Sequence, residues 1–181
     1  MIEKFKLDGK TALVTGGAGL LGIEHAVALL EMGAVVVISD IDEGKLGQAL
    51  DQISSRTGSE RIHKVIMDVT NKTDIENLAE SLAAKGLEID ILVNNAAVDP
   101  KVDSNKGLLS ESRFENFSLE QWNFQLNVGL TGCFLCSQVM GTRMSRTGKG
   151  GVILNIASDL SVFRQINAFT GKRVSLMTSN L

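Results

Sequence analysis

Short apolar runs alternate along the chain with longer segments in which apolar residues recur every three or four positions. The runs occupy 11–15, 35–39, 64–67, 91–94 and 152–156, and the longer segments occupy 21–32, 43–55, 73–85 and 119–146. Runs that are apolar almost throughout are typical of strands covered on both faces, and the longer segments are typical of helices. Their alternation predicts βαβ units around a parallel sheet. Asn71 and Ser118 are expected N-caps of two helices, and Gln121 completes a capping box with Ser118.

The regular pattern stops near residue 161. Residues 99–116 are polar and irregular, so we expect a long loop near the ligand face there. Residues 162–181 show neither a helical stripe nor alternation, and we expect them to form a non-native or disordered tail. For residues 1–161 the pattern predicts one domain of the α/β class, built on a parallel sheet.

Composition narrows the function classes. The 181 residues are 44% hydrophobic and 22% charged, which suits one globular domain. A net charge of −3 gives no positive surface for nucleic acid or an anionic membrane, and no stretch is long enough to span a membrane. No apolar segment of a signal peptide follows the N-terminal lysines. Two cysteines make no disulfide framework, so we expect a reducing, cytoplasmic compartment.

A glycine-rich turn joins the first predicted strand to the first helix. Residues 15–22 read Thr-Gly-Gly-Ala-Gly-Leu-Leu-Gly, and such a turn lets backbone N–H groups approach a pyrophosphate at a helix N-terminus. The second strand leads to Asp40, near the spacing expected for the acid that binds the adenosine ribose. A carboxylate there accepts both ribose hydroxyls and repels a 2′-phosphate, so the pair favours NAD over NADP. The alternative is a simple strand–helix turn in which Asp40 only caps the next helix.

Four motifs at successive strand ends resemble those of the short-chain dehydrogenase/reductase family. Residues 15–22 resemble its TGxxxGxG fingerprint, and Asp68-Val69 resembles its adenine-binding pair. The Asn-Asn-Ala-Ala of residues 94–97 is similar to its NNAG motif, which braces the central sheet under the cofactor, and residues 155–158 match the segment that carries the catalytic serine. The resemblance covers residues 7–161. It implies that residues 1–161 form one incomplete dinucleotide-binding domain. The implied fold is a Rossmann-type doubly wound parallel sheet with strand order 3-2-1-4-5, truncated after the fifth strand.

The resemblance implies an NAD-dependent oxidoreductase with a small-molecule substrate and no metal. The implied catalytic residue is Ser158. The implied cofactor-binding residues are Gly16, Gly17, Gly19, Leu20, Leu21, Gly22, Asp40, Ile41, Asp68, Val69, Asn95, Ala96 and Ala97. Family members usually form homodimers or homotetramers, partly through the helix that would start near Leu119.

Three departures from the family pattern change the expected activity. Leu20 replaces the middle glycine of the fingerprint, and Gly129 stands where the family has a structural and proton-relay asparagine. Asn127 is two residues away, about 200° round a helix, so it cannot simply replace that asparagine. The chain has no tyrosine; the Tyr-x-x-x-Lys base is therefore missing, and Lys172 alone cannot take the alcohol proton. We expect an inactive chain that retains NAD(H) binding.

Two other functions remain open. The chain could be a non-catalytic dinucleotide-binding or regulatory module that pairs with an intact paralogue, or a fragment without function. The abrupt loss of pattern also suggests a frameshift after about residue 162. A second reading frame through residues 164–174 permits Pro-Asp-Gln-Arg-Phe-Tyr-Arg-Lys-Glu-Gly, which resembles a segment that follows the serine motif in family members with Asn-Asn-Ala-Ala.

The remaining reactive residue types have simpler explanations. Cys133 and Cys136 are three residues apart on an apolar helix, which is typical of core positions rather than of a redox or metal site. His25 and His63 have no partner in a triad order. Three aromatic residues of the long helix are expected to pack in the core: Trp122, Phe124 and Phe134.

Overall fold

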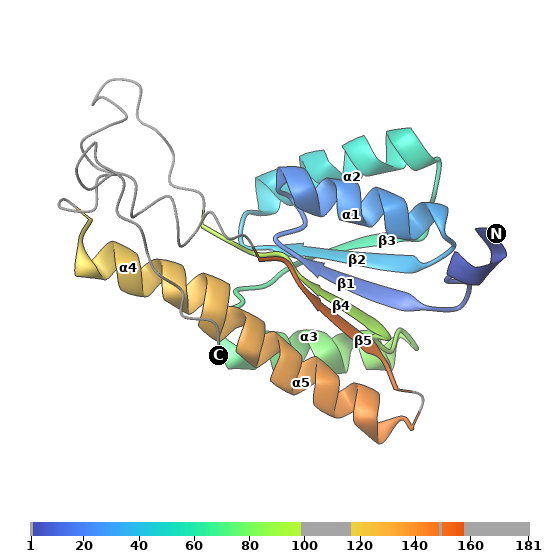
Figure 1. The fold of residues 1–181 in the computed structure, drawn as a ribbon. Helices are drawn as coiled ribbons and strands as arrows, with labels where there is room; N and C mark the ends of the chain where they lie inside the picture. The colour runs from blue at the N-terminus through green and yellow to red at the C-terminus, as the bar shows by residue number, and fades with distance from the viewer. Residues whose placement is uncertain (1, 99–116, 149, 158–181) are drawn as a thin grey trace, which may run out of the picture. The chain divides into compact units, whose positions relative to one another are not determined.

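A five-stranded parallel sheet with strand order β3-β2-β1-β4-β5 forms the centre of the protein (Figure 1). The computed structural model describes residues 2–98, 117–148 and 150–157. The strands are β1 (Thr11–Thr15), β2 (Val35–Asp40), β3 (Ile62–Ile66), β4 (Ile91–Asn94) and β5 (Val152–Asn155). Every pair of neighbours is parallel. The predicted fold class and strand order are confirmed.

Helices cover the two faces of this sheet. The helical segments are η1 (Ile2–Phe5), α1 (Leu20–Glu31), α2 (Glu43–Thr57), α3 (Lys72–Ala84), α4 (Leu119–Leu126), the π-helical turn η3 (Asn127–Thr131) and α5 (Gly132–Arg146). Helices α1 and α2 lie on one face, and α3 and α5 lie on the other (Figure 1). The sheet and the helices α1, α2, α3 and α5 belong to one compact unit, residues 1–98 with 125–156.

Two apolar clusters, one on each face of the sheet, hold the layers together. There are two because successive side chains of a strand point to opposite faces. One cluster joins α1 and α2 to strand residues that include Val14, Val36 and Ile38. The other joins α3 and α5 to residues that include Leu13, Val37 and Leu92. The central strands therefore read as continuous apolar runs, as expected for strands covered on both sides.

The expected helix caps are present. The Asn71 side chain accepts a hydrogen bond from the Thr73 N–H at 3.0 Å, and Ser118 Oγ accepts one from the Gln121 N–H at 3.1 Å. Each bond satisfies one of the N–H groups that a first helical turn leaves without a partner.

Two sequence-based expectations are wrong. The edge strands β3 and β5 are not covered on both faces: β5 is exposed at all four positions, and β3 begins at Ile62 with exposed His63 and Lys64. The aromatic residues expected to pack in the core are exposed by 40% (Trp122), 56% (Phe124) and 59% (Phe134). In α5 the reason is that the helix turns Cys136, Met140 and Met144 toward the sheet instead.

Candidate cofactor-binding site

The glycine turn after β1 is packed too closely to carry side chains. Gly16 has φ +61°, and a Cβ there would lie 2.8 Å from the Ala96 Cα. A Cβ on Gly17 would lie 2.6 Å from the Ile38 Cβ. The Gly17 N–H donates to the Ser39 carbonyl at 2.9 Å, which ties the turn to β2. Glycine is required at both positions, at the first for its positive φ and its closeness to β4, and at the second for its closeness to β2.

The turn leads directly into the N-terminus of α1. A Cβ on Gly22 would overlap the Gly16 carbonyl oxygen, so this glycine lets the helix start against the turn. The N-cap, Gly19, supplies no side-chain acceptor, and the first turn of α1 holds no acidic residue. The first-turn N–H groups and the positive end of the helix dipole are therefore available to an anion. Leu20 and Leu21 beside them are 83% and 56% exposed.

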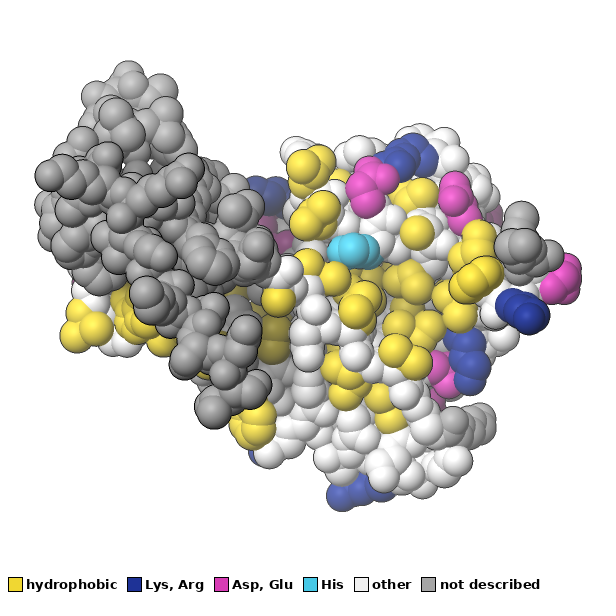
Figure 2. Space-filling view, viewed as in Figure 1, with side chains coloured by type: hydrophobic (Ala, Val, Ile, Leu, Met, Phe, Trp, Pro, Cys, Tyr) yellow, Lys and Arg dark blue, Asp and Glu magenta, His cyan; other side chains and the backbone are white. Residues whose placement is uncertain are grey.

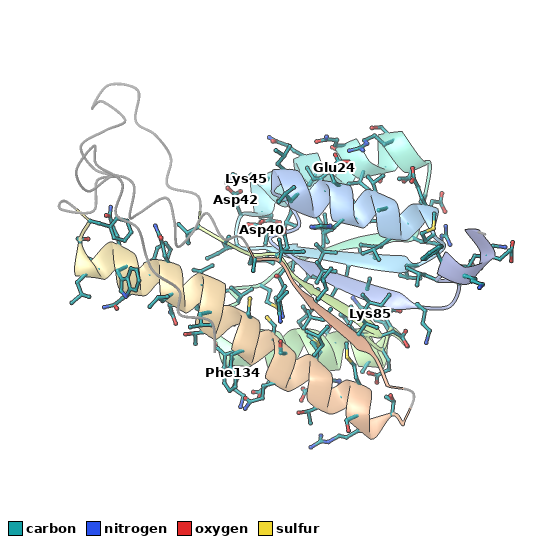
Figure 3. All side chains as sticks on the ribbon, viewed as in Figure 1. Glu24, Asp40, Asp42, Lys45, Lys85 and Phe134 are labelled. Atoms are coloured by element: carbon teal, nitrogen blue, oxygen red, sulfur yellow. The ribbon has the colours of Figure 1, made fainter. Side chains whose placement is uncertain are left out.

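Asp40 ends β2 next to the same turn (Figure 3). Its Oδ2 accepts from the Ala18 N–H at 3.4 Å and its Oδ1 from the Asp42 N–H at 3.3 Å. Asp42, not Asp40, caps α2, by accepting from the Lys45 N–H at 3.0 Å. That hydrogen bond lowers the pKa of the Asp42 carboxyl group below its ordinary value. The capping interpretation of Asp40 is wrong, and its carboxylate instead lies against the glycine turn.

Thr15 and Asn95 clamp the ends of β1 and β4 together. Thr15 Oγ1 accepts from the backbone N–H groups of Asn95 at 3.0 Å and Ala96 at 3.1 Å. In return Asn95 Nδ2 donates to the carbonyl oxygens of Thr15 at 3.0 Å and Gly16 at 3.1 Å. The reciprocal bonds fix the position of the glycine turn relative to residues 95–97, so the structure brings the glycine turn and the Asn-Asn-Ala-Ala motif together.

Asp68 and Val69 follow β3 at the same edge of the sheet. Asp68 Oδ1 accepts from the Thr70 N–H at 2.8 Å and from Thr70 Oγ1 at 2.7 Å, which shapes the turn before α3. Val69 is buried, and a Cβ on Gly132 would lie 2.8 Å from its Cγ2. Val69 thus packs against the start of α5. In contrast, Ile41, which follows β2, is 68% exposed.

Sequence reasoning placed Asn94 in a motif but missed its partners. Asn94 is buried, and its Nδ2 lies 3.0 Å from Ser137 Oγ and 2.8 Å from Asn155 Oδ1, to which it donates. A third contact reaches the Cys133 carbonyl at 3.4 Å. One amide therefore joins β4, β5 and α5. No sequence signal distinguishes Ser137 from Ser145, the other serine of the long helix.

Several predicted residues have other outcomes. Ser158, Lys172 and the expected loop at 99–116 lie outside the described residues. Gly129 and Asn127 both lie in the π-helical turn η3, a form of helix found mostly as single turns that are frequent at functional sites. Cys136 is buried as expected, and burial is the main cause that raises the pKa of its thiol, to about 12.

The sequence is similar to those of known proteins. A family profile described as short chain dehydrogenase matches residues 10–170. D-threitol dehydrogenase of Mycolicibacterium smegmatis is 34% identical over 156 residues, 85% of this chain and 54% of that protein. The (2S)-[(R)-hydroxy(phenyl)methyl]succinyl-CoA dehydrogenase subunit BbsD of Thauera aromatica is 34% identical over 84% of this chain and 56% of its own length. The chain thus spans about half the length of these two relatives.

A solved structure supports the same assignment. The crystal structure of NAD+-bound xylitol dehydrogenase is similar with a TM-score of 0.73 at 26% identity, over 87% of this chain and 56% of that one. Within the described ranges, no helix is both long and apolar enough to cross a membrane. Since the family profile covers most of the sequence and the five-stranded sheet has the matching order, the chain belongs to the short-chain dehydrogenase family.

Proposed function

We propose that the chain binds NAD(H) at the carboxyl ends of β1, β2, β3 and β4. The observation that carries the proposal is the Asp40 carboxylate, which lies against the N–H of Ala18 in the glycine turn at 3.4 Å. A carboxylate that borders an anion-binding turn is placed to accept the ribose hydroxyls of a nucleotide whose pyrophosphate lies on the turn. The similar xylitol dehydrogenase was solved with NAD+ bound.

Each predicted residue has a definite part in this proposal. The backbone of residues 16–22 and the α1 N-terminus hold the pyrophosphate, and Asp40 with Ile41 borders the adenosine ribose. Asp68 and Val69 border the adenine, and residues 95–97 lie beneath the nicotinamide half. When bound, NAD+ supplies a hydride acceptor; the residues named here only bind and orient it.

NAD is preferred over NADP in this proposal. A 2′-phosphate would place negative charge next to Asp40, and like charges about 4 Å apart near a protein surface repel by roughly 1–4 kcal/mol. The nearby Lys45 ammonium lies 3.4 Å from Asp42 Oδ2, so it is already paired with another carboxylate (Figure 3). The lower end of this range corresponds to about a fivefold change in affinity, so we expect NADP to bind at least about fivefold more weakly than NAD.

Calorimetric titration with both cofactors tests the preference. The Asp40→Ser variant should narrow the difference between NAD and NADP, because it removes the repelling carboxylate. The matched control is Asp51→Ser, which removes the same charge from an exposed position of α2 and should change neither affinity. Equal affinities in the unaltered protein, or an unchanged preference in Asp40→Ser, would contradict the proposal.

We also propose that these 181 residues do not catalyse hydride transfer by themselves. They contain no tyrosine, and general acid–base help of the kind a phenolate gives is worth roughly a hundred- to ten-thousand-fold. A panel of alcohols and ketones, followed by nicotinamide absorbance, should show no turnover above background. Turnover that a Ser158→Ala variant abolishes would show that the chain is an active dehydrogenase.

A second candidate is a cofactor-binding module that pairs with another chain. The observation that favours it is an apolar stripe of Leu126, Leu130 and Phe134, which are 39%, 66% and 59% exposed. Figure 3 shows Phe134 on the side of α5 that faces away from the sheet. Light scattering on the protein alone and with a full-length family member separates the two functions, since only a pairing module forms a defined mixed complex.

The cytoplasmic location and the frameshift stay predictions. Cell fractionation tests the location, and the coding DNA tests the frameshift.

A further inference from the structure

Leu20 has the most exposed side chain among the large hydrophobic residues of the described part of the chain. It is 83% exposed, whereas Ile23 and Leu30 further along α1 are buried. Figure 2 shows hydrophobic side chains on the surface over the left-hand part of α1 in Figure 1, where the helix begins. Leu20 therefore adds little to the packing of α1 on the sheet, and the fold does not require a leucine there.

Backbone N–H groups without a partner lie beside this side chain. Leu20 is the first residue of α1 and follows the N-cap, Gly19. The Gly19 N–H donates to the Gly16 carbonyl at 3.1 Å, and the Ile23 N–H donates to the Gly19 carbonyl at 3.0 Å. Between these two bonds, the N–H groups of Leu20 and Leu21 donate to no group that the structure describes, as is usual for a first helical turn. They are among the groups proposed above to hold the pyrophosphate.

The Leu20 side chain starts toward the end of the helix at which these N–H groups lie, because the Cα–Cβ bonds of an α-helix tilt toward its N-terminus. The turn before Leu20 leaves space there. Residues 16–19 carry no side chain larger than a methyl group, and a Cβ built on Gly19 would meet only the Gly16 carbonyl oxygen within 4 Å, at 3.3 Å. An anion bound at the start of α1 would therefore have this one large apolar side chain beside it.

We propose that Leu20 is an apolar cover of the bound pyrophosphate, which excludes water from it and slows release of the cofactor. The proposal rests on the proposed function and adds a side chain to the backbone groups that hold the cofactor. Excluding water lowers the local dielectric constant, which strengthens the attraction between the phosphates and the N–H groups. Covering about 50 Å² of the leucine surface is worth roughly tenfold in affinity.

Calorimetric titration of the full chain with NAD, ADP and adenosine tests the cover. Leu20→Ala should weaken NAD and ADP by a similar factor, roughly tenfold, and leave adenosine, which has no phosphate, unchanged. Stopped-flow fluorescence should show faster release of NADH from this variant. Leu20→Met keeps an apolar side chain of similar size and should bind as the unaltered protein does. The matched control is Leu119→Ala, which truncates a 73% exposed leucine at the first position of α4 and should change none of these affinities.

Two results with Leu20→Ala would overturn the cover and leave the proposed function standing. One is unchanged or tighter binding of ADP, which would make the leucine idle or obstructive. The other is an equal loss for adenosine, which would place the leucine on the nucleoside instead. Urea unfolding of the same variant should give an unchanged stability, since the side chain is exposed. An unaltered protein that binds neither NAD nor ADP would overturn the proposed function, and the cover with it.

Discussion

The carboxyl ends of β1 and β4 are joined by side-chain hydrogen bonds in both directions. In contrast, β5 pairs with β4 and packs against α5, and among the described residues one side-chain hydrogen bond reaches it, from Asn94 to Asn155. Strands β1 and β4 are buried, and β5 is exposed along its length. The part of the sheet that would hold a nucleotide is therefore fixed by bonds within the chain. The strand that leads toward Ser158 has fewer such bonds and is more exposed. Nucleotide binding should accordingly need fewer elements of the family fold than catalysis does.

Truncating one leucine in each of two neighbouring strands tests this difference most strongly. Leu92→Ala in β4 removes a fully buried side chain and should lower the free energy of unfolding by about 2–5 kcal/mol. Leu154→Ala in β5 removes a half-exposed side chain and should cost only about 0.5 kcal/mol. Urea unfolding followed by circular dichroism measures both. Similar losses would mean that β5 is as firmly held as β4.

The glycine turn should tolerate almost no added volume. Gly22→Ala places a methyl group against the Gly16 carbonyl oxygen, so α1 must move away from the turn. We expect a loss of about 1–3 kcal/mol in stability and a loss of measurable NAD binding. Gly129→Ala is the control, because nothing lies within 4 Å of its added Cβ and its φ is not positive. A Gly22→Ala protein that binds NAD normally would contradict the site described here.

Removing the hydrogen bonds of the buried Asn94 should lower the stability more than removing those of an exposed asparagine. Asn94→Ala removes hydrogen bonds to Ser137 and Asn155 and should cost about 2 kcal/mol, at roughly 1 kcal/mol for each net bond. Asn71→Ala removes one exposed helix cap and should cost about 1 kcal/mol. Thermal unfolding of the two variants gives the comparison. Equal costs would show that Asn94 does not join the three elements energetically.

The ionisation of the Cys136 thiol should have the smallest effect on stability at neutral pH. Burial and, to a lesser extent, the neighbouring Cys133 raise its pKa to about 12, so at pH 8 only about one molecule in ten thousand carries the thiolate. Alkylation by iodoacetamide should be roughly a thousandfold slower than for a free thiol. Because the folded-state pKa is raised, this thiol adds stability below its unfolded-state pKa and loses that contribution as the pH rises toward 12. Rapid labelling of Cys136 in folded protein would show that α5 is loosely packed.

The sequence predicted the regular parts of the fold well. Strands β1 and β4 match their predicted ranges, because both are uninterrupted apolar runs. The start of β3 was missed because an edge strand exposes polar residues, here His63 and Lys64. The Thr15–Asn95 clamp could not be derived, because it joins residues about eighty positions apart. Local pattern predicts elements, and only the folded chain shows which polar side chains meet.

Hydrogen exchange with and without NAD, followed by mass spectrometry, tests the central claim most directly. If the chain binds the cofactor by itself, saturating NAD should slow exchange in peptides covering residues 15–23 and 40–42. Residues 152–155 should exchange quickly in both states. Peptides of β1 and β4 should exchange slowly even without NAD, since these strands are buried and clamped. The account is contradicted if NAD leaves the exchange of residues 15–23 unchanged, or if β1 and β4 exchange as quickly as β5 without it.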